Sequence, residues 1–300
     1  MASLTVDYYT STCPPAEIMV KNIVYQALRS DSTASAGLLR MHFHDCFVEV
    51  GGCDGSVLID STADNTAEKD SPPNQSLHGF EIIDQAKQVI ERICPGVVSC
   101  ADILTMAARD AVAWAGGPSY DVPKGRKDGR RSKIEDTSSL PPPSLNSTKL
   151  IELFGQSGFT AQEVVTLAGA HTLGVAQCKF FKNRLRGFDS TNDVDPTLNP
   201  NFANMLSSVC SSGDSTNVSL DWTSDSFDNR YFIALQMGGG VLTSDQTLFT
   251  SPETKEVVST YAMSQDKFFF DFSQVIVKLG MLNVKEGDEG EVRLDCRKIN

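Results

Sequence analysis

The residues with the clearest chemical potential lie between positions 40 and 47. Small and apolar side chains at positions 34–39 precede them and predict a buried helix. On that helix Arg40 and His44 would lie roughly 40° apart around the axis, and Phe43 would share their face. One face therefore carries a permanent cation, an aromatic ring and a base that titrates near neutral pH. This combination suits proton transfer together with stabilisation of developing charge.

Two other histidines help to interpret this group. His42 would lie roughly 160° from His44 around the helix, so the two cannot ligate one metal ion while the helix is regular. His171 stands among small residues at positions 168–174, which would let a bulky group approach the backbone. Taken alone, His44 could be a buried structural histidine and Arg40 an ion-pair partner. The second histidine favours a functional interpretation.

The chain resembles the secreted plant haem peroxidases, class III of the plant peroxidase superfamily. The resemblance extends from residues 8–14, which include Cys13, to the C-terminal residues 296–300. It implies an all-α fold of two lobes, with one haem b between a distal and a proximal lobe. Residues 1–300 would form a single peroxidase domain. The distal lobe would comprise about residues 1–140 and 250–300, the proximal lobe about residues 145–250, with a proline hinge at 141–143.

Apolar periodicity predicts helices at residues 17–29, 34–47, 79–93, 100–114, 149–155, 161–168, 253–262 and 272–279. Strand-like pieces such as residues 241–243 are too few for a sheet. The family resemblance also implies a buried ion pair between Asp102 and Arg126, although two solvated charges are the simpler alternative.

Composition excludes several classes of partner. The net charge of −12 and a pI near 4.8 argue against binding to nucleic acid or to an anionic membrane surface. The sequence contains no run of about 18 apolar residues, so it predicts no membrane-spanning helix. Residues 1–4 lack the basic and apolar blocks of a secretory signal. We interpret Met1 as an expression start on a mature chain, because the resemblance implies that a signal was removed.

The resemblance assigns roles to the distal residues. His44 would be the general base, Arg40 would stabilise charge on the separating oxygen, and Phe43 would form the aromatic wall. Asn74 would accept a hydrogen bond from one nitrogen of His44 and would itself be held by Glu68. These five residues form the predicted distal catalytic group.

The proximal roles also follow from the resemblance. His171 would be the axial ligand of the haem iron, and Asp245 would accept the other N–H of its ring. Without the resemblance Asp245 would be interpreted as a helix N-cap. Ser35 and Gln177 are expected to contact the haem group. Pro141 and Phe180 are expected to contact substrate, although three successive prolines more often mark a plain linker.

Two calcium sites are expected. Residues 49–56 suit either a hard cation or an ordinary polar turn, and the resemblance favours the cation. The distal ligands would be Asp45, Val48, Gly52, Asp54 and Ser56. Six residues separate the cysteines of this loop where the family usually has four, so the choice of Gly52 among the glycines stays open.

The proximal ligands would be Thr172, Asp221, Thr223 and Asp228. This loop is one residue shorter than is usual in the family, and Asp225 could replace one of the loop ligands.

The chain contains eight cysteines and no CxxC pair, which favours disulfides over zinc or redox motifs. Eight cysteines leave on the order of 100 possible pairings. The resemblance implies the pairs Cys13–Cys94, Cys46–Cys53, Cys100–Cys296 and Cys178–Cys210. Oxidised cysteines would place the protein outside the cytosol.

The implied reaction is reduction of hydrogen peroxide followed by two one-electron oxidations of phenolic donors such as monolignols. The protein would be a secreted monomer of the cell wall or apoplast, acting in lignin and phenolic metabolism and in peroxide removal. Two other classes of protein are the alternatives. A zinc hydrolase would need an HExxH motif or three convergent ligands, and neither occurs. A non-enzymatic calcium-binding cell-wall protein would not need Arg40, His44, His171 and Asp245 together.

Overall fold

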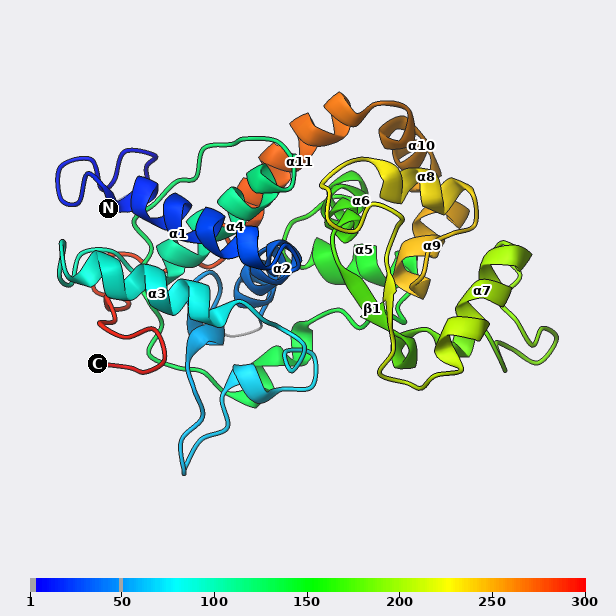
Figure 1. The fold of residues 1–300 in the computed structure, drawn as a ribbon, viewed down its shortest axis with the longest axis horizontal. Helices are drawn as coiled ribbons and strands as arrows, with labels where there is room; N and C mark the ends of the chain where they lie inside the picture. Colours follow the sequence, from blue (N-terminus) through cyan, green and yellow to red (C-terminus); the bar gives the residue numbers. More distant parts are fainter. Residues whose placement is uncertain (1–3, 49–50) are drawn as a thin grey trace. The chain divides into compact units, whose positions relative to one another are not determined.

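The structure, a computed structural model, describes residues 4–48 and 51–300. The chain forms two compact units (Figure 1). Unit 1 comprises Met1–Leu140 and Ile276–Asn300, and unit 2 comprises Pro141–Val275. Residues 250–275, assigned to the distal lobe from the sequence, lie in unit 2, because the helix at residues 255–263 packs against its neighbours at 230–236 and 243–250.

Unit 1 is built around four helices, α1 Ala16–Ser30, α2 Ala34–Cys46, α3 Phe80–Glu91 and α4 Cys100–Trp114. Helix α4 packs against the other three. Leu38, Met41 and Ile103 are fully buried between them. Because α2 packs against this apolar core, its position in unit 1 is fixed. Three short 3-10 segments, η1 Ser56–Leu58, η2 Glu68–Asp70 and η3 Ile134–Ser139, lie in the long connections.

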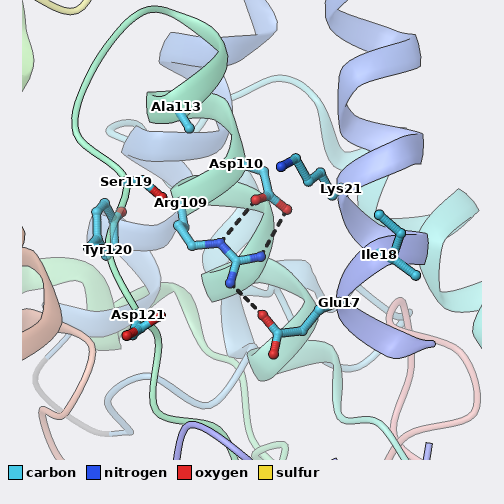
Figure 2. Close-up of a pocket in the computed structure, with 9 residues that line it drawn as sticks. All are labelled: Glu17, Ile18, Lys21, Arg109, Asp110, Ala113, Ser119, Tyr120 and Asp121. Carbon is cyan, nitrogen blue, oxygen red and sulfur yellow. Dashed lines mark hydrogen bonds and ion pairs between the residues drawn. The ribbon is translucent and has the colours of Figure 1, made fainter. Parts of the chain in front are cut away.

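Polar contacts also join α1 to α4. Figure 2 shows a pocket in which the Arg109 guanidinium lies between Glu17 of α1 and Asp110 of α4. Arg109 Nη1 donates to Glu17 Oε2 at 2.7 Å, and Arg109 Nε donates to Asp110 Oδ1 at 3.0 Å. Arg109 thus links the two helices through its ion pair with Glu17.

The expected ion pair between Asp102 and Arg126 is confirmed. Arg126 Nη1 donates to Asp102 Oδ1 at 2.9 Å, and both side chains are buried. Tyr9 donates its hydroxyl to Asp102 Oδ2 at 2.7 Å. The pair joins the start of α4 to the N-terminal segment and to the loop after α4.

Unit 2 contains α5 Ser147–Gly155, α6 Ala161–Ala168, α7 Pro200–Cys210, α8 Arg230–Gln236, α9 Thr243–Thr250, α10 Lys255–Met263 and the beginning of α11 Gln265–Leu279. It also contains the 3-10 segments η4 Gly169–Thr172, η5 Cys178–Phe180 and η6 Lys182–Arg184. Aromatic rings form much of its core. Phe227, Phe232 and Tyr261 surround Phe268 with ring centroids 4.9–5.7 Å apart. A Cβ atom at Gly169 would lie 2.4 Å from the ring of Phe268, so only glycine allows η4 to approach this core.

The all-α class is confirmed, with four differences from the predicted elements. Helix α11 begins at Gln265, whereas a helix was predicted only from residue 272. Residues 241–243 are not strand-like, because α9 begins at Thr243. Helices α7, α8 and α9 were not predicted. Two strands, β1 Val175–Gln177 and β2 Asn217–Ser219, form an antiparallel pair with Val175 opposite Ser219. They are only three residues long, too short for a period-2 pattern to identify.

All four implied disulfides are present, and all eight cysteines are used. The bond between Cys100 and Cys296 spans 196 residues and should stabilise the fold by about 5 kcal/mol on the chain-entropy model. Within the described ranges, no helix is both long and apolar enough to cross a membrane.

Candidate active site

The distal group is assembled on α2 in unit 1. Arg40 Nε donates to His44 Nε2 at 3.2 Å, and His44 Nδ1 lies 2.5 Å from Asn74 Oδ1. The Phe43 ring meets the His44 ring edge-on, with centroids 5.7 Å apart. The helix periodicity therefore places these three α2 side chains together, and the loop before α3 supplies Asn74.

The hydrogen bonds of Asn74 determine which nitrogen of His44 carries a proton. The amide nitrogen of Asn74 donates to the backbone carbonyl of Glu68 at 2.8 Å. The amide oxygen must therefore accept from His44, which puts a proton on Nδ1 and a lone pair on Nε2. Glu68 thus holds Asn74 through its backbone oxygen, while its carboxylate accepts from Ser56 Oγ at 3.1 Å. The expected contact between Asn74 and Glu68 is therefore present, and the Glu68 backbone makes it.

Burial keeps His44 neutral. Burial and the positive charge of Arg40 together lower the pKa of His44 to about 3, against the hydrogen bond with Asn74, which raises it. The imidazole is therefore a neutral base at physiological pH. Its lone pair accepts from Arg40 in this structure, so a substrate proton would have to take the place of the Arg40 N–H.

Two residues that hold Arg40 were not identified from the sequence. Arg40 Nη1 donates to Ser76 Oγ at 2.8 Å, and Nη2 donates to the Pro73 carbonyl at 2.8 Å. Both lie beside Asn74 in the chain. The loop that orients His44 therefore also orients Arg40. Their closeness to Asn74 was the available signal, but a backbone carbonyl carries no sequence signature.

The proximal group is assembled within unit 2. His171 lies in η4, and its Nδ1 is 2.8 Å from Asp245 Oδ1 in the first turn of α9. The hydroxyl of Tyr231 donates to the same oxygen at 2.9 Å. Asp245 is only 2% exposed, and burial together with this carboxylate raises the pKa of Tyr231 well above its usual range. Asp245 does not act as an N-cap, and the role of Tyr231 was not predicted.

Buried acidic groups gather at the expected distal calcium site. Burial and the neighbouring Asp54 raise the pKa of Asp45 to about 8. Burial, Asp45 and Asp54 raise the pKa of Glu68 to about 9. Glu68 Oε1 is buried and has no hydrogen-bond partner among the described residues. Closely spaced buried carboxylates with an unpartnered oxygen fit a cation.

Two features of this site were not predicted from the sequence. Lys285 Nζ lies 2.8 Å from Asp54 Oδ2. The carbonyl of Gly52 accepts from Asp54 N at 2.8 Å. The expected contact of Val48 with calcium stays a prediction, and residues 49 and 50 of this loop lie outside the described residues.

The expected proximal calcium ligands also come together. Thr172 Oγ1 donates to Asp221 Oδ2 at 2.8 Å and lies 3.2 Å from Asp228 Oδ1. Thr223 Oγ1 lies 3.2 Å from one oxygen of each carboxylate. Asp225, the suggested substitute, is exposed and makes none of these contacts. In the described part of the chain, no three His, Cys, Asp or Glu side chains are arranged to hold a metal, so a calcium ion at either place would also need hydroxyl or carbonyl oxygens.

Four further residues were predicted to contact haem or substrate. Ser35 is buried, and its hydroxyl donates to the Ser32 carbonyl at 2.7 Å at the start of α2. Gln177 ends β1, Phe180 is 37% exposed beside it, and Pro141 begins unit 2. Their contacts with haem or substrate stay predictions.

Comparison with known proteins identifies the family. A family model described as "Peroxidase" matches residues 20–264. Peroxidase 47 of Arabidopsis thaliana is 61% identical over 297 residues, covering 99% of this chain and 89% of the relative. Peroxidase 64 of the same plant is 49% identical over 300 residues (99% and 93%), and Peroxidase 5 of Vitis vinifera is 47% identical over 306 residues (100% and 92%).

The chain therefore belongs to the peroxidase family, as a class III plant haem peroxidase. The protein is an enzyme, and the alternatives of a zinc hydrolase and of a non-enzymatic cell-wall protein are not favoured. Membership of the family implies a haem cofactor and hydrogen peroxide as substrate.

Proposed function

We propose that this peroxidase uses one haem b held by His171 to reduce hydrogen peroxide, and that it oxidises phenolic donors in one-electron steps. The observation that carries the proposal is the state of His44, a buried neutral imidazole whose Nδ1 bonds Asn74 and whose Nε2 lies 3.2 Å from the Arg40 guanidinium.

The residues around His171 fit a haem iron. Because Nδ1 donates to the buried carboxylate of Asp245, Nε2 carries the lone pair that a metal needs. A carboxylate acceptor also makes the ring a stronger electron donor. When bound, the haem supplies the electrons that peroxide reduction takes, and two donor molecules restore them.

The chain's own residues move the proton. His44 Nε2 takes a proton from one oxygen of hydrogen peroxide and delivers it to the other oxygen, which leaves as water. The Nε–H of Arg40, released from His44, points toward the charge that develops as the O–O bond breaks. Positioned proton transfer of this kind is worth about 10²–10⁴ in rate. The contacts of Arg40 with Ser76 and Pro73 keep its charge near the reacting oxygens.

Phenolic donors are the proposed reducing substrates, monolignols among them, with Phe180 and Pro141 as contact residues. Phe180 is 37% exposed, which leaves part of its ring accessible to a small aromatic molecule. Four disulfides persist in an oxidising compartment, which supports secretion to the cell wall and a role in lignin and phenolic metabolism and in peroxide removal. We propose that the enzyme acts there as a monomer.

We also propose two Ca²⁺ ions per chain. The distal ion would be held by Asp45, Val48, Gly52, Asp54 and Ser56, and the proximal ion by Thr172, Asp221, Thr223 and Asp228. The buried, acidic, oxygen-rich character of both clusters suits an ion that prefers about six to eight oxygen ligands. The metal content of purified protein, compared between parent and Asp54→Asn, tests the distal site.

The assignment of the haem ligand is tested by His171→Ala. We expect the parent to take up one haem per chain and to turn over a guaiacol-type phenol with peroxide. His171→Ala should lose the parent's haem absorption band and regain a similar band when free imidazole is added. His78→Ala, which changes an exposed histidine, is the control and should match the parent. An unchanged haem band in His171→Ala would contradict the assignment.

A further inference from the structure

We propose that Lys285 is an internal counter-cation of the distal oxygen cluster, which is defined here as Asp45, Asp54, Ser56 and Glu68. Its ammonium group balances this cluster when calcium is absent, and it weakens calcium binding by competing for Asp54. The inference rests on the distal calcium site of the proposed function and adds a residue that sets the affinity of that site.

The contact with Asp54 is close and sheltered. Lys285 Nζ lies 2.8 Å from Asp54 Oδ2, and the two side chains are 26% and 2% exposed. Asp54 Oδ1 accepts from the backbone N–H of Ser56 at 3.2 Å. One oxygen of this carboxylate is thus used by the loop itself, and the other by the lysine.

The backbone of Lys285 is held in place. Lys127 N donates to the Lys285 carbonyl at 2.8 Å, within an antiparallel bridge between these two residues. Two residues earlier the chain turns at Asn283, which has a φ of 45°. A fixed backbone directs the lysine stem toward Asp54 and lowers the entropy lost in forming the ion pair.

The segment that carries Lys285 lies against the distal loop. Cys53 N donates to the Leu282 carbonyl at 3.2 Å. A Cβ atom at Gly52 would lie 2.5 Å from that same carbonyl oxygen, so the two backbones approach more closely than a side chain would allow. Lys285 therefore belongs to the wall of the distal site and is not a solvated surface lysine.

The burial of three neighbouring carboxyl groups explains why a cation is favoured there. Asp45, Asp54 and Glu68 are each at most 2% exposed. Arg293, a nearby permanent cation, donates its guanidinium hydrogens to the carbonyls of Gly55 and Cys296. Among the ion pairs found in the described residues, the one that involves a carboxylate of the cluster is made by Lys285.

Calcium and the Lys285 ammonium group compete for the Asp54 carboxylate. A divalent ion bound by Asp54 would lie within a few ångströms of the ammonium group, where like charges repel strongly. Either the lysine withdraws and gives up its ion pair, or it stays and repels the ion. Both outcomes lower calcium affinity, and both make the calcium-free loop more stable than it would be without the lysine.

The test compares Lys285→Met with the parent enzyme, both loaded with haem and stripped of calcium by a chelator. Methionine keeps the stem and removes the charge. We expect Ca²⁺ to bind Lys285→Met at least about tenfold more tightly by titration calorimetry. We also expect a lower midpoint of thermal unfolding than the parent in chelator, with a smaller difference between the two in saturating calcium.

Three further variants make the result specific. Lys285→Arg keeps the charge and should resemble the parent. Lys127→Met removes a charge from the opposite side of the same bridge and should leave the calcium affinity unchanged. Asp54→Asn identifies the distal binding step, because it should remove that step and leave the proximal one.

The outcomes distinguish a failure of the Lys285 inference from a failure of the distal calcium site on which it rests. If Lys285→Met binds calcium with the parent's affinity and loses the same stability with and without calcium, the lysine is merely structural and the inference is overturned. If the parent shows no calcium step that Asp54→Asn removes, the distal calcium site itself is wrong, and the inference falls with it.

Discussion

At the scale of single residues, two imidazoles with the same hydrogen-bonding pattern have different chemical properties. His44 bonds through Nδ1 to the amide oxygen of Asn74, whereas His171 bonds through Nδ1 to the carboxylate of Asp245. A neutral acceptor fixes the tautomer without adding charge, while an anionic acceptor also enriches the ring in electrons. The acceptor thus suits His44 to be a proton acceptor and His171 to be a metal ligand.

The low pKa of His44 predicts how the peroxide step depends on pH. Burial and Arg40 hold that pKa at about 3 rather than at the usual 6.5, so the neutral base persists over the whole neutral range. The rate should fall only as pH drops through the lowered pKa, and it should be level between about pH 5 and pH 8. Stopped-flow rates across this range measure it. A decline centred near pH 6.5 would show that His44 is not held in this state.

The sequence predicted those features of the site that depend on the spacing of residues along one helix. Helix periodicity was enough to put Arg40, Phe43 and His44 on one face. The roles of Asn74 and Asp245 came from the family resemblance, and the structure places both beside the expected histidine. Tyr231 and Lys285 could not be found, because a contact formed by tertiary folding leaves no spacing pattern along the chain.

At the scale of elements, the ion pair at the start of α4 is the buried contact whose loss should matter most. Asp102 is fully buried and accepts from Tyr9, Gly125 and Arg126. Asp102→Ala should lower the free energy of unfolding by about 3–5 kcal/mol, because it leaves the buried Arg126 guanidinium without its counter-charge.

Denaturant titration of the calcium-loaded enzyme measures this loss. The matched control is Glu152→Ala, which breaks an exposed pair with Lys149 on α5 and should cost less than about 1 kcal/mol. Equal losses for the two variants would mean that the buried pair contributes no more than a surface one.

Element prediction succeeded where a helix has both an apolar face and a local start signal. Helix α4 begins after Ser99, whose side chain accepts from Asp102 N, and α6 begins with a capping box between Thr160 and Glu163. Both have the predicted bounds. Helix α9 is polar along most of its length, so it has no apolar stripe to reveal it. Its position is set by tertiary contacts, among them the Asp245 carboxylate with His171.

At the scale of the whole molecule, the chain carries a net charge of −12, and several of its carboxyl groups are buried in unit 1. Burial and neighbouring carboxyl groups raise the pKa values of Asp45 and Glu68 to about 8 and about 9. Both therefore bind protons in the folded state that they release on unfolding, between their ordinary values near 4 and these raised values. Over that interval the calcium-free protein should lose stability as pH rises. Calcium binding should offset the loss, because it favours the ionised carboxylates.

Calcium removal should consequently destabilise the protein more at about pH 8 than at about pH 5. Thermal unfolding with calcium and with a chelator, at both pH values, gives the two differences to compare. Asp54→Asn, which removes a proposed ligand of the distal site, should reduce the difference measured at about pH 8. A difference that is larger at the lower pH would contradict raised carboxyl pKa values in the distal oxygen cluster.

Each of the four disulfides joins two cysteines of the same unit. Three lie in unit 1 and one, Cys178–Cys210, lies in unit 2. Each unit is thus cross-linked internally, and His44 and His171 are each held in a covalently braced framework. Such bracing favours the fixed geometry that proton transfer and metal ligation require.

The most direct test of the central claim, that His44 transfers the proton of hydrogen peroxide, is the stopped-flow rate of the haem-loaded enzyme with peroxide. The variants are His44→Ala and, as control, His42→Ala, which removes another buried imidazole from the same helix. His44→Ala should keep its haem and react about 10²–10⁴ times more slowly than the parent, while His42→Ala keeps most of the rate. A His44→Ala enzyme that reacts with peroxide as fast as the parent would contradict the claim.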